Sequence, residues 1–389
     1  MSEYNVICGD CREVMRGMPE SRIDAIVTDP PYGLGFMGKD WDSPGGIGDF
    51  PMRRTTEANT VNTGVSRQGG RQRSTVDFAK RQANDARMFQ EWAQEWAADC
   101  LRVAKPGAHL LAFGGTRMYH RLACAIEDAG WEIRDCIMWV YSQGFPKSHN
   151  LDGEWDGWGT ALKPSYEPLI VARKSLDGTV AANMAKHRTG AMNIDGCRVL
   201  ATDAAYKANC SGDRGHADNR SRVMDFGMGC GTANELGRWP ANMIHDGSDE
   251  VMAAFPEAPG QQRSVGPEFG SKTSVNTYGD YGPRQNFAPR GDAGSAARFY
   301  YCAKASRADR NDGAENGHPT VKPTDLMRYL CRLVTPPKGT ILDPFAGSGS
   351  TGRGAVAEGF NFVGIELDPA YVEIAKARIA AAKPESLFA

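Results

Sequence analysis

The chain lacks the features that mark membrane, secreted and metal-binding proteins. None of its apolar segments is long enough to span a bilayer, and residues 1–5 show no basic stretch followed by an apolar run. Ten cysteines are present, but only Cys8 and Cys11 form a CxxC pattern, and no second pair stands at zinc spacing. We therefore expect a cytoplasmic protein with no membrane partner, no metal site, and reduced thiols that serve only structure.

An excess of charge of one sign is also missing. The 45 Lys and Arg residues nearly balance 47 Asp and Glu, which gives a formal net charge of -2. The molecule as a whole therefore does not attract an anionic partner, and any nucleic-acid surface must be a local basic patch. With 389 residues, the chain has room for one large α/β domain and an additional module.

Short apolar runs alternate with helical stretches, a pattern typical of a mainly parallel sheet covered by helices on both faces. Seven strands are predicted, at residues 4–8, 23–28, 109–113, 131–141, 168–172, 340–342 and 361–366. Helices are predicted at residues 11–18, 85–103, 116–129, 324–334, about 350–357 and 369–381. The expected fold is α/β, with a doubly wound, seven-stranded and mostly parallel sheet.

Two segments interrupt this regular pattern. The first is rich in Gly, Ser, Thr and Arg, and it predicts a flexible basic loop at about residues 43–82. In the second, residues 174–314, glycine, asparagine and arginine are frequent, and we expect an irregular inserted module. The chain is therefore expected to divide into residues 1–173, the 174–314 module, and residues 315–389.

A glycine motif lies near the end of the chain. Residues 347–352 fit G-x-G-x-x-G, follow a predicted strand and open a predicted helix. Glycines let the backbone pass close to a ligand, and Glu366, at the end of the next strand, can accept hydrogen bonds from ribose hydroxyls. The alternative is a plain tight turn. Because the motif lacks the lysine of a P-loop, we do not expect triphosphate chemistry.

The position of this motif is as informative as its pattern. Only about forty residues follow it, too few to complete a nucleotide-binding sheet. The remaining strands must come from upstream, mainly from the first 175 residues. The cofactor half of the sheet is therefore expected late in the chain and the catalytic half early, an order that an ordinary nicotinamide dehydrogenase would not show.

Together, two motifs resemble those of the β-class amino-DNA methyltransferases. Residues 28–33 read Thr-Asp-Pro-Pro-Tyr-Gly, and residues 343–349 read Asp-Pro-Phe-Ala-Gly-Ser-Gly. In that family the catalytic motif precedes the cofactor motif, with a target-recognition region between them. The resemblance covers residues 1–42, 84–175 and 315–382. It implies a class I methyltransferase fold, Rossmann-like and circularly permuted, with residues 174–314 as the target-recognition module.

The residue types of the first motif suit that chemistry. An exocyclic amine of adenine or cytosine is a poor nucleophile, because its lone pair is delocalised into the ring. Asp29 and the carbonyl of Pro30 can accept its two N–H bonds and draw the nitrogen toward tetrahedral geometry. Pro30 and Pro31 hold the turn rigid, and Tyr32 can stack on a base swung out of the duplex. The alternative is an ordinary strand exit, since Pro-Pro is common in turns.

The resemblance also implies a site for S-adenosylmethionine. Its members would be Asp10, Thr320, Lys322, Asp343, Phe345, Gly347, Gly349 and Glu366. Glu366 would hold the ribose, and Asp10 would lie near the adenine moiety. Thr320 and Lys322 belong to residues 318–323, His-Pro-Thr-Val-Lys-Pro, which resemble a further cofactor segment of the family.

The expected function is site-specific transfer of a methyl group to the N6 amino group of adenine in DNA. In the family, Asp at the first position of the catalytic tetrapeptide leans toward adenine, and Ser leans toward N4 of cytosine. Cytosine-N4 methylation is therefore the alternative. A NAD-dependent oxidoreductase and a DNA-binding protein without catalysis are weaker alternatives.

The expected partner is double-stranded DNA with a flipped target base. Candidate basic residues in the loop are Arg53, Arg54, Arg67, Arg71, Arg73, Lys80 and Arg81. The alternative is a solvated, disordered loop with no role. Those in the module are Lys174, Lys186, His187, Arg188, Arg198, Arg214, Arg220 and Arg222. An aromatic run, expected mainly in the core, comprises Trp139, Tyr141, Phe145, Trp155 and Trp158. The resemblance suits a bacterial or bacteriophage-infected cell and leaves a homodimer and a restriction endonuclease partner open.

Overall fold

The computed structural model describes residues 2–33, 75–146, 148–200, 237–259, 274–276, 279–281, 293–303, 307–318 and 320–382. The chain divides into two compact units. Unit 1 comprises Met1–Trp139, Tyr166–Asn193 and Lys304–Ala389, and unit 2 comprises Val140–Ser165 and Ile194–Ala303. Within the described ranges, no helix has both the length and the apolar character needed to cross a membrane.

Unit 1 is built on the strands that the apolar runs predicted. They are β1 (Tyr4–Cys8), β2 (Ile23–Thr28), β3 (Ala104–Phe113), β4 (Glu132–Val140), β5 (Tyr166–Arg173), β10 (Thr340–Asp343) and β11 (Asn361–Glu366). Their order across the sheet is β1-β11-β10-β2-β3-β5-β4. The two strands that flank the glycine motif, β10 and β11, therefore lie between strands from the first 28 residues of the chain.

The sheet is mixed and mostly parallel. Parallel pairing joins β1 to β11, β11 to β10, β10 to β2, and β2 to β3, whereas β5 runs antiparallel to β3. Among the described residues the sheet has nine strands, so the predicted number of seven is wrong. The two additional strands, β6 (Met243–His245) and β9 (Tyr301–Cys302), pair in parallel in unit 2. They are too short to produce the apolar run by which a strand is identified in a sequence.

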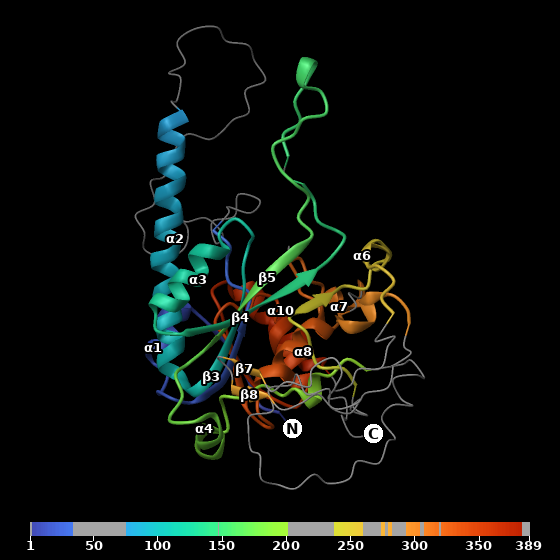
Figure 1. Cartoon of the computed structure of the whole chain (residues 1–389). Coiled ribbons are helices and arrows are strands. Elements are labelled where there is room, and N and C mark those ends of the chain that lie inside the picture. Colours follow the sequence, from blue (N-terminus) through green and yellow to red (C-terminus); the bar gives the residue numbers. More distant parts are fainter. Residues whose placement is uncertain are drawn as a thin grey trace. The chain divides into compact units, whose positions relative to one another are not determined.

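Helices cover both faces of the unit 1 sheet (Figure 1). The first group is α1 (Cys11–Arg16), α2 (Thr75–Val103) and α3 (Tyr119–Asp128), and the second is α8 (Thr324–Val334), α9 (Ser350–Ala357) and α10 (Pro369–Ala380). Leu110 and Ala112 of β3 pack in one buried cluster with α1, α2 and α3. Leu111 and Phe113 are equally buried but point to the other face, since side chains alternate along a strand. Both faces of β3 are therefore in the core.

Helix α2 begins earlier than predicted. It starts at Thr75, so residues 75–82, which were predicted to belong to the basic loop, are helical. Residues 79–83, Ala-Lys-Arg-Gln-Ala, are strong helix formers, which explains why the helix extends over this polar stretch. The rest of the predicted loop lies outside the described residues.

Unit 2 is less regular than unit 1 in its described residues. Besides β6 and β9 it contains α6 (Asp249–Ala254), the hairpin of β7 (Ser274–Asn276) and β8 (Gly279–Tyr281), and short 3-10 helices. Residues 140–165 run out and back as a narrow hairpin (Figure 1). Phe145, Trp155 and Trp158 on this hairpin are exposed, so the expectation that the aromatic run packs mainly in the core is wrong for these three residues.

Candidate active site

The two motifs of the sequence meet at the ends of adjacent strands. Asp29 follows β2, the glycine motif follows β10, and the two strands pair in parallel. The Thr28 hydroxyl donates a hydrogen bond to Asp343 Oδ1 at 2.7 Å, across 315 positions of sequence. In parallel α/β sheets, ligands bind beyond the carboxyl ends of the strands, and this pair of turns lies there.

Four side chains converge beside the Asp-Pro-Pro-Tyr turn. Lys322 Nζ donates to Asp29 Oδ2 at 2.6 Å and lies 3.1 Å from Glu167 Oε2. The Tyr32 hydroxyl lies 2.9 Å from Asp29 Oδ1 and 3.1 Å from the same oxygen of Glu167. These residues come from the end of β2, the start of β5 and the segment before α8, so the cluster joins three distant parts of unit 1.

The positive charge of this cluster lies on a nearly buried lysine, Lys322. The Lys322 side chain is 9% exposed, and its ammonium lies 4.7 Å from the centroid of the buried Phe113 ring. Burial alone would lower the pKa of Lys322, but the charges and hydrogen bonds of Asp29 and Glu167 outweigh burial and raise the pKa. For Tyr32, burial raises the pKa of the hydroxyl, and the two carboxylates raise it further. The lysine is therefore charged and the tyrosine neutral at physiological pH.

The glycine motif forms a tight turn against the end of β11. Gly347 has φ of +51°, and its N–H donates to Glu366 Oε2 at 2.8 Å. The other oxygen, Oε1, accepts from Asp368 N at 2.9 Å. Each carboxylate oxygen has a second lone pair, so Glu366 can still accept a ribose hydroxyl. Burial raises the pKa of Glu366, although the backbone hydrogen bonds oppose the shift.

Gly349 serves the packing of this turn. Its φ is +82°, and a Cβ added there would lie 2.9 Å from the Cα of Ala375 on α10. The absence of a side chain therefore lets the loop approach α10. Arg378, on the same helix and fully buried, holds the loop by donating hydrogen bonds to the Ser348 carbonyl and hydroxyl at 2.5 and 2.9 Å.

Asp343 and Phe345 connect the glycine motif to the core. Asp343 is buried, and besides Thr28 it accepts from the backbone N–H of Phe345 at 3.0 Å. Burial raises the pKa of Asp343 to about 6. The Phe345 ring lies 5.5 Å from Trp92 and 5.4 Å from Trp96 of α2, measured between ring centroids. Both residues of the predicted cofactor set therefore fix the turn in place.

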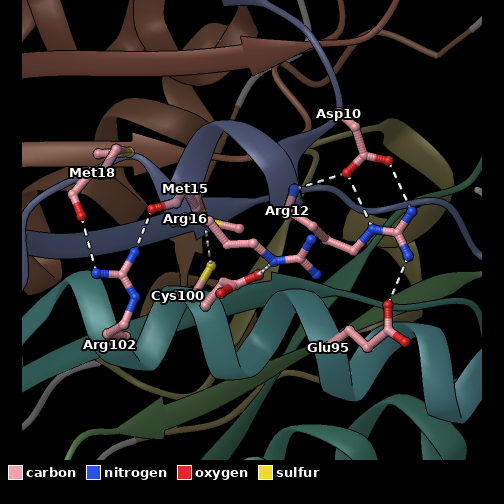
Figure 2. Close-up of polar contacts among 9 residues, drawn as sticks. Asp10, Arg12, Met15, Arg16, Met18, Glu95, Cys100 and Arg102 are labelled. Atoms are coloured by element: carbon pink, nitrogen blue, oxygen red, sulfur yellow. Dashed lines mark hydrogen bonds and ion pairs between the residues drawn. The ribbon is translucent and has the colours of Figure 1, made fainter.

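Asp10 caps helix α1 (Figure 2). Its Oδ1 accepts from the backbone N–H of Arg12 at 2.8 Å, and its Oδ2 accepts from the Arg12 guanidinium at 2.9 Å. Arg12 also donates to Glu95 of α2 at 2.7 Å. Burial alone would raise the pKa of Asp10, but Arg12 outweighs it and lowers the pKa. The neighbouring Gly9 N–H donates to the Glu366 carbonyl at 2.9 Å, which brings the Asp10 turn next to the end of β11.

His318, the first residue of the predicted cofactor segment, lies against the glycine turn. His318 Nδ1 is 2.6 Å from the Thr320 carbonyl, and the His318 ring contacts Tyr371 of α10 edge to face. A Cβ added at Gly347 would lie 3.2 Å from His318 Nε2, so His318 borders the turn. Thr320 itself is exposed. Lys322 is the member of this segment that reaches the Asp-Pro-Pro-Tyr turn.

Two residues of the site were not predicted from the sequence. Glu167 was missed because nothing in the sequence shows that β5 runs antiparallel to β3, which places its first residues beside the ends of the parallel strands. Arg378 was missed because an arginine on an amphipathic helix normally faces solvent. An acidic residue at a strand end was the available signal for Glu167.

The DNA methylase family (N6_N4_Mtase) matches residues 23–377. The chain belongs to this family. Its methyl donor is S-adenosylmethionine, and the predicted resemblance is confirmed. The residues of the glycine turn fit that cofactor. Glu366 can accept hydrogen bonds from ribose hydroxyls, and the glycines let the backbone approach a ligand.

Individual relatives are distant. The type II methyltransferase M.HindIII of Haemophilus influenzae is 25% identical over 194 residues, covering 46% of this chain and 61% of the relative. M.HpaI of Haemophilus parainfluenzae is 26% identical over 155 residues, covering 40% and 37%. The chain thus aligns with less than two thirds of either relative. The crystal structure of the M1.HpyAVI–SAM complex has 14% identity and a TM-score of 0.39, with 96% of this chain and 98% of that one covered.

Proposed function

We propose that the protein transfers a methyl group from S-adenosylmethionine to the N6 amino group of adenine in DNA. The observation that carries this proposal is the joining of the two motifs by the Thr28–Asp343 hydrogen bond of 2.7 Å at the ends of β2 and β10. A turn suited to activating an amine lies there beside a turn suited to holding a nucleoside cofactor. Proximity and orientation supply much of the rate enhancement for an in-line transfer of this kind.

The catalytic turn would act through fixed acceptors. Asp29 Oδ1 and the Pro30 carbonyl would accept the two N–H bonds of the amine, and Tyr32 would stack on the flipped base. Lys322 holds Asp29 Oδ2 at 2.6 Å, so the carboxylate is oriented before substrate arrives. The methylated nitrogen must lose one proton, and the adjacent carboxylate oxygen of Asp29 is the acceptor in reach. Bound S-adenosylmethionine supplies a sulfonium methyl as the electrophile.

The cofactor would be held by residues from both ends of the chain. Glu366 would take the ribose hydroxyls, and the backbone of Gly347 and Gly349 would lie along the ligand. Asp10 and Thr320 remain proposed contacts, because Asp10 is engaged by Arg12 and Thr320 lies on the exposed part of its segment. Asp343 and Phe345 would act by fixing the turn.

Adenine is proposed as the base because the tetrapeptide begins with Asp29. Cytosine N4 is the alternative, since the same geometry activates either amine. A nicotinamide-dependent oxidoreductase is not supported, because the DNA methylase family matches residues 23–377. A DNA-binding protein without catalysis is disfavoured by the intact cluster of Asp29, Tyr32 and Lys322.

We propose that unit 2 reads the target sequence. Four basic residues assigned to this task, Lys174, Lys186, His187 and Arg188, belong instead to unit 1. Lys174 donates to the carbonyls of Leu101 in α2 and Ala104 at the start of β3, which is a structural role. Arg198 belongs to unit 2 and lies over the Trp239 ring at 5.3 Å. Arg214, Arg220 and Arg222 lie outside the described residues.

The proposal is tested by identifying the product. The purified protein is incubated with S-adenosylmethionine and mixed-sequence duplex DNA. The DNA is then digested to nucleosides, which are identified by mass spectrometry. The Asp29→Ala variant is the matched control. N6-methyladenine that depends on Asp29 supports the proposal, and N4-methylcytosine keeps the reaction but corrects the base. No methylated nucleoside, from protein shown to bind the cofactor, contradicts it.

A further inference from the structure

The Tyr32 hydroxyl has one hydrogen to donate, and two carboxylate oxygens lie within hydrogen-bond distance of it. Asp29 Oδ1 lies 2.9 Å from it and Glu167 Oε2 lies 3.1 Å from it. A phenol donates one hydrogen bond at a time, so only one of these oxygens can accept it in any instant. While the hydroxyl donates to Asp29, Oδ1 has one lone pair fewer for an amine N–H.

Asp29 Oδ2 accepts a hydrogen bond from the Lys322 ammonium at 2.6 Å in either case. Because this charged donor weakens Oδ2 as an acceptor, Oδ1 is the oxygen better suited to the substrate amine. The ammonium also lies 3.1 Å from Glu167 and 3.3 Å from the tyrosine oxygen. Lys322 therefore holds Glu167 within reach of the hydroxyl.

Glu167 lies on a strand that is fixed by pairing. It stands at the second residue of β5, whose Pro168 carbonyl accepts from the Gly114 N–H at 2.9 Å. From Leu169 onward, β5 pairs with β3 in antiparallel register and is buried. A side chain on such a strand keeps its position more closely than one on a loop.

We infer that Glu167 is a positioning residue. When the target base enters, Glu167 accepts the hydrogen bond of the Tyr32 hydroxyl in place of Asp29. Asp29 Oδ1 is then free to accept the amino group that is to be methylated. This inference rests on the proposed function and deepens it, because it explains how one aspartate can serve both the resting site and the substrate.

The test is a double-mutant cycle read in single-turnover methyl transfer to mixed-sequence duplex DNA. Glu167→Ala is introduced into the parent and into a Tyr32→Phe background, which keeps the ring but has no hydroxyl to remove. We expect a loss of roughly a hundredfold in the parent, and less than about threefold in the Phe background. The affinity for S-adenosylmethionine should change by less than about threefold in each variant.

Glu167→Gln is the conservative variant and protects against a folding artefact. Its amide oxygen still accepts the hydroxyl, so its rate should stay within about tenfold of the parent. Equal losses from Glu167→Ala in both backgrounds would overturn the inference, because they would show a role that does not pass through the hydroxyl. No loss in the parent background would also overturn it. If the parent methylates no nucleoside, the proposed function fails first, and this inference falls with it.

Discussion

Lys322 Nζ lies 2.6 Å from Asp29 Oδ2, although 293 positions separate the two residues in the sequence. The segment predicted to hold the cofactor therefore touches Asp29, the carboxylate proposed to activate the amine. A nearly buried ammonium between Asp29 and Glu167 offsets the repulsion of two carboxylates and fixes one oxygen of Asp29. The late and early parts of the chain are thus joined by charge as well as by strand pairing.

Removing this ammonium should cost both stability and rate. In Lys322→Met, Asp29 and Glu167 would face each other without a cation, which typically destabilises a buried cluster by about 3–5 kcal/mol. We expect a lower midpoint of unfolding in denaturant and a methyl-transfer rate reduced by more than tenfold at saturating cofactor. Lys322→Arg keeps the charge and should retain more of both. Parent-like stability and rate in Lys322→Met would contradict this account.

The glycine turn offers a matched pair of substitutions. Gly349 and Gly359 both have φ of +82°, but an added Cβ lies 2.9 Å from Ala375 at the first and meets nothing within 4 Å at the second. Gly359→Ala should cost about 1–2 kcal/mol for the left-handed backbone alone. Gly349→Ala should cost about 1–3 kcal/mol more, because α10 must move, and should weaken binding of S-adenosylmethionine. Equal unfolding free energies and equal affinities would show that the α10 contact is unimportant.

Arg378 should act on the cofactor site without touching the ligand. It donates to Ser348 in the glycine turn and, at 2.8 Å, to the Asp309 carbonyl. Burial is the main reason that its pKa falls to about 10, so the charge is itself costly there. In Arg378→Met the unpaired carbonyls should cost about 1–3 kcal/mol, partly offset by removal of the buried charge. Calorimetric titration should show at least a tenfold weaker affinity for S-adenosylmethionine, and an unchanged affinity would refute this role.

A buried histidine should make stability depend on pH. His109 on β3 is 3% exposed, and burial, with smaller contributions from Arg173 and Arg134, lowers its pKa from 6.5 to about 4. Between pH 6.5 and 4 the unfolded chain binds a proton at this residue that the folded protein does not, so stability falls as the pH falls. The parent should lose about 3 kcal/mol more than His109→Gln between pH 7 and pH 4. Parallel stability curves for the two proteins would exclude this effect.

The sequence was most informative where local signals were strong. Residues 324–334 and 361–366 were predicted to be a helix and a strand, and they coincide with α8 and β11 because apolar periodicity and turn residues mark both ends. Long-range relationships were not accessible. The reversed direction of β5, which brings Glu167 to Tyr32, depends on tertiary pairing.

Two predicted cofactor residues have neighbours in the protein that a motif does not show. Gly349 is predicted to leave room for a ligand, and in the structure it also leaves room for α10. Asp10 was expected near the cofactor, and the structure shows that its carboxylate is held by Arg12 at the start of α1. A motif shows that a residue type is required at a position, but which neighbour requires it depends on the packing.

The role of Asp29 is tested most directly by measuring cofactor binding and methyl transfer together in Asp29→Ala. We expect a single-turnover rate on duplex DNA lower by about a thousandfold, or about 4 kcal/mol, with an affinity for S-adenosylmethionine within a few fold of the parent. A rate within a few fold of the parent would contradict this role, because the amine would then be activated elsewhere than at the Asp29 turn.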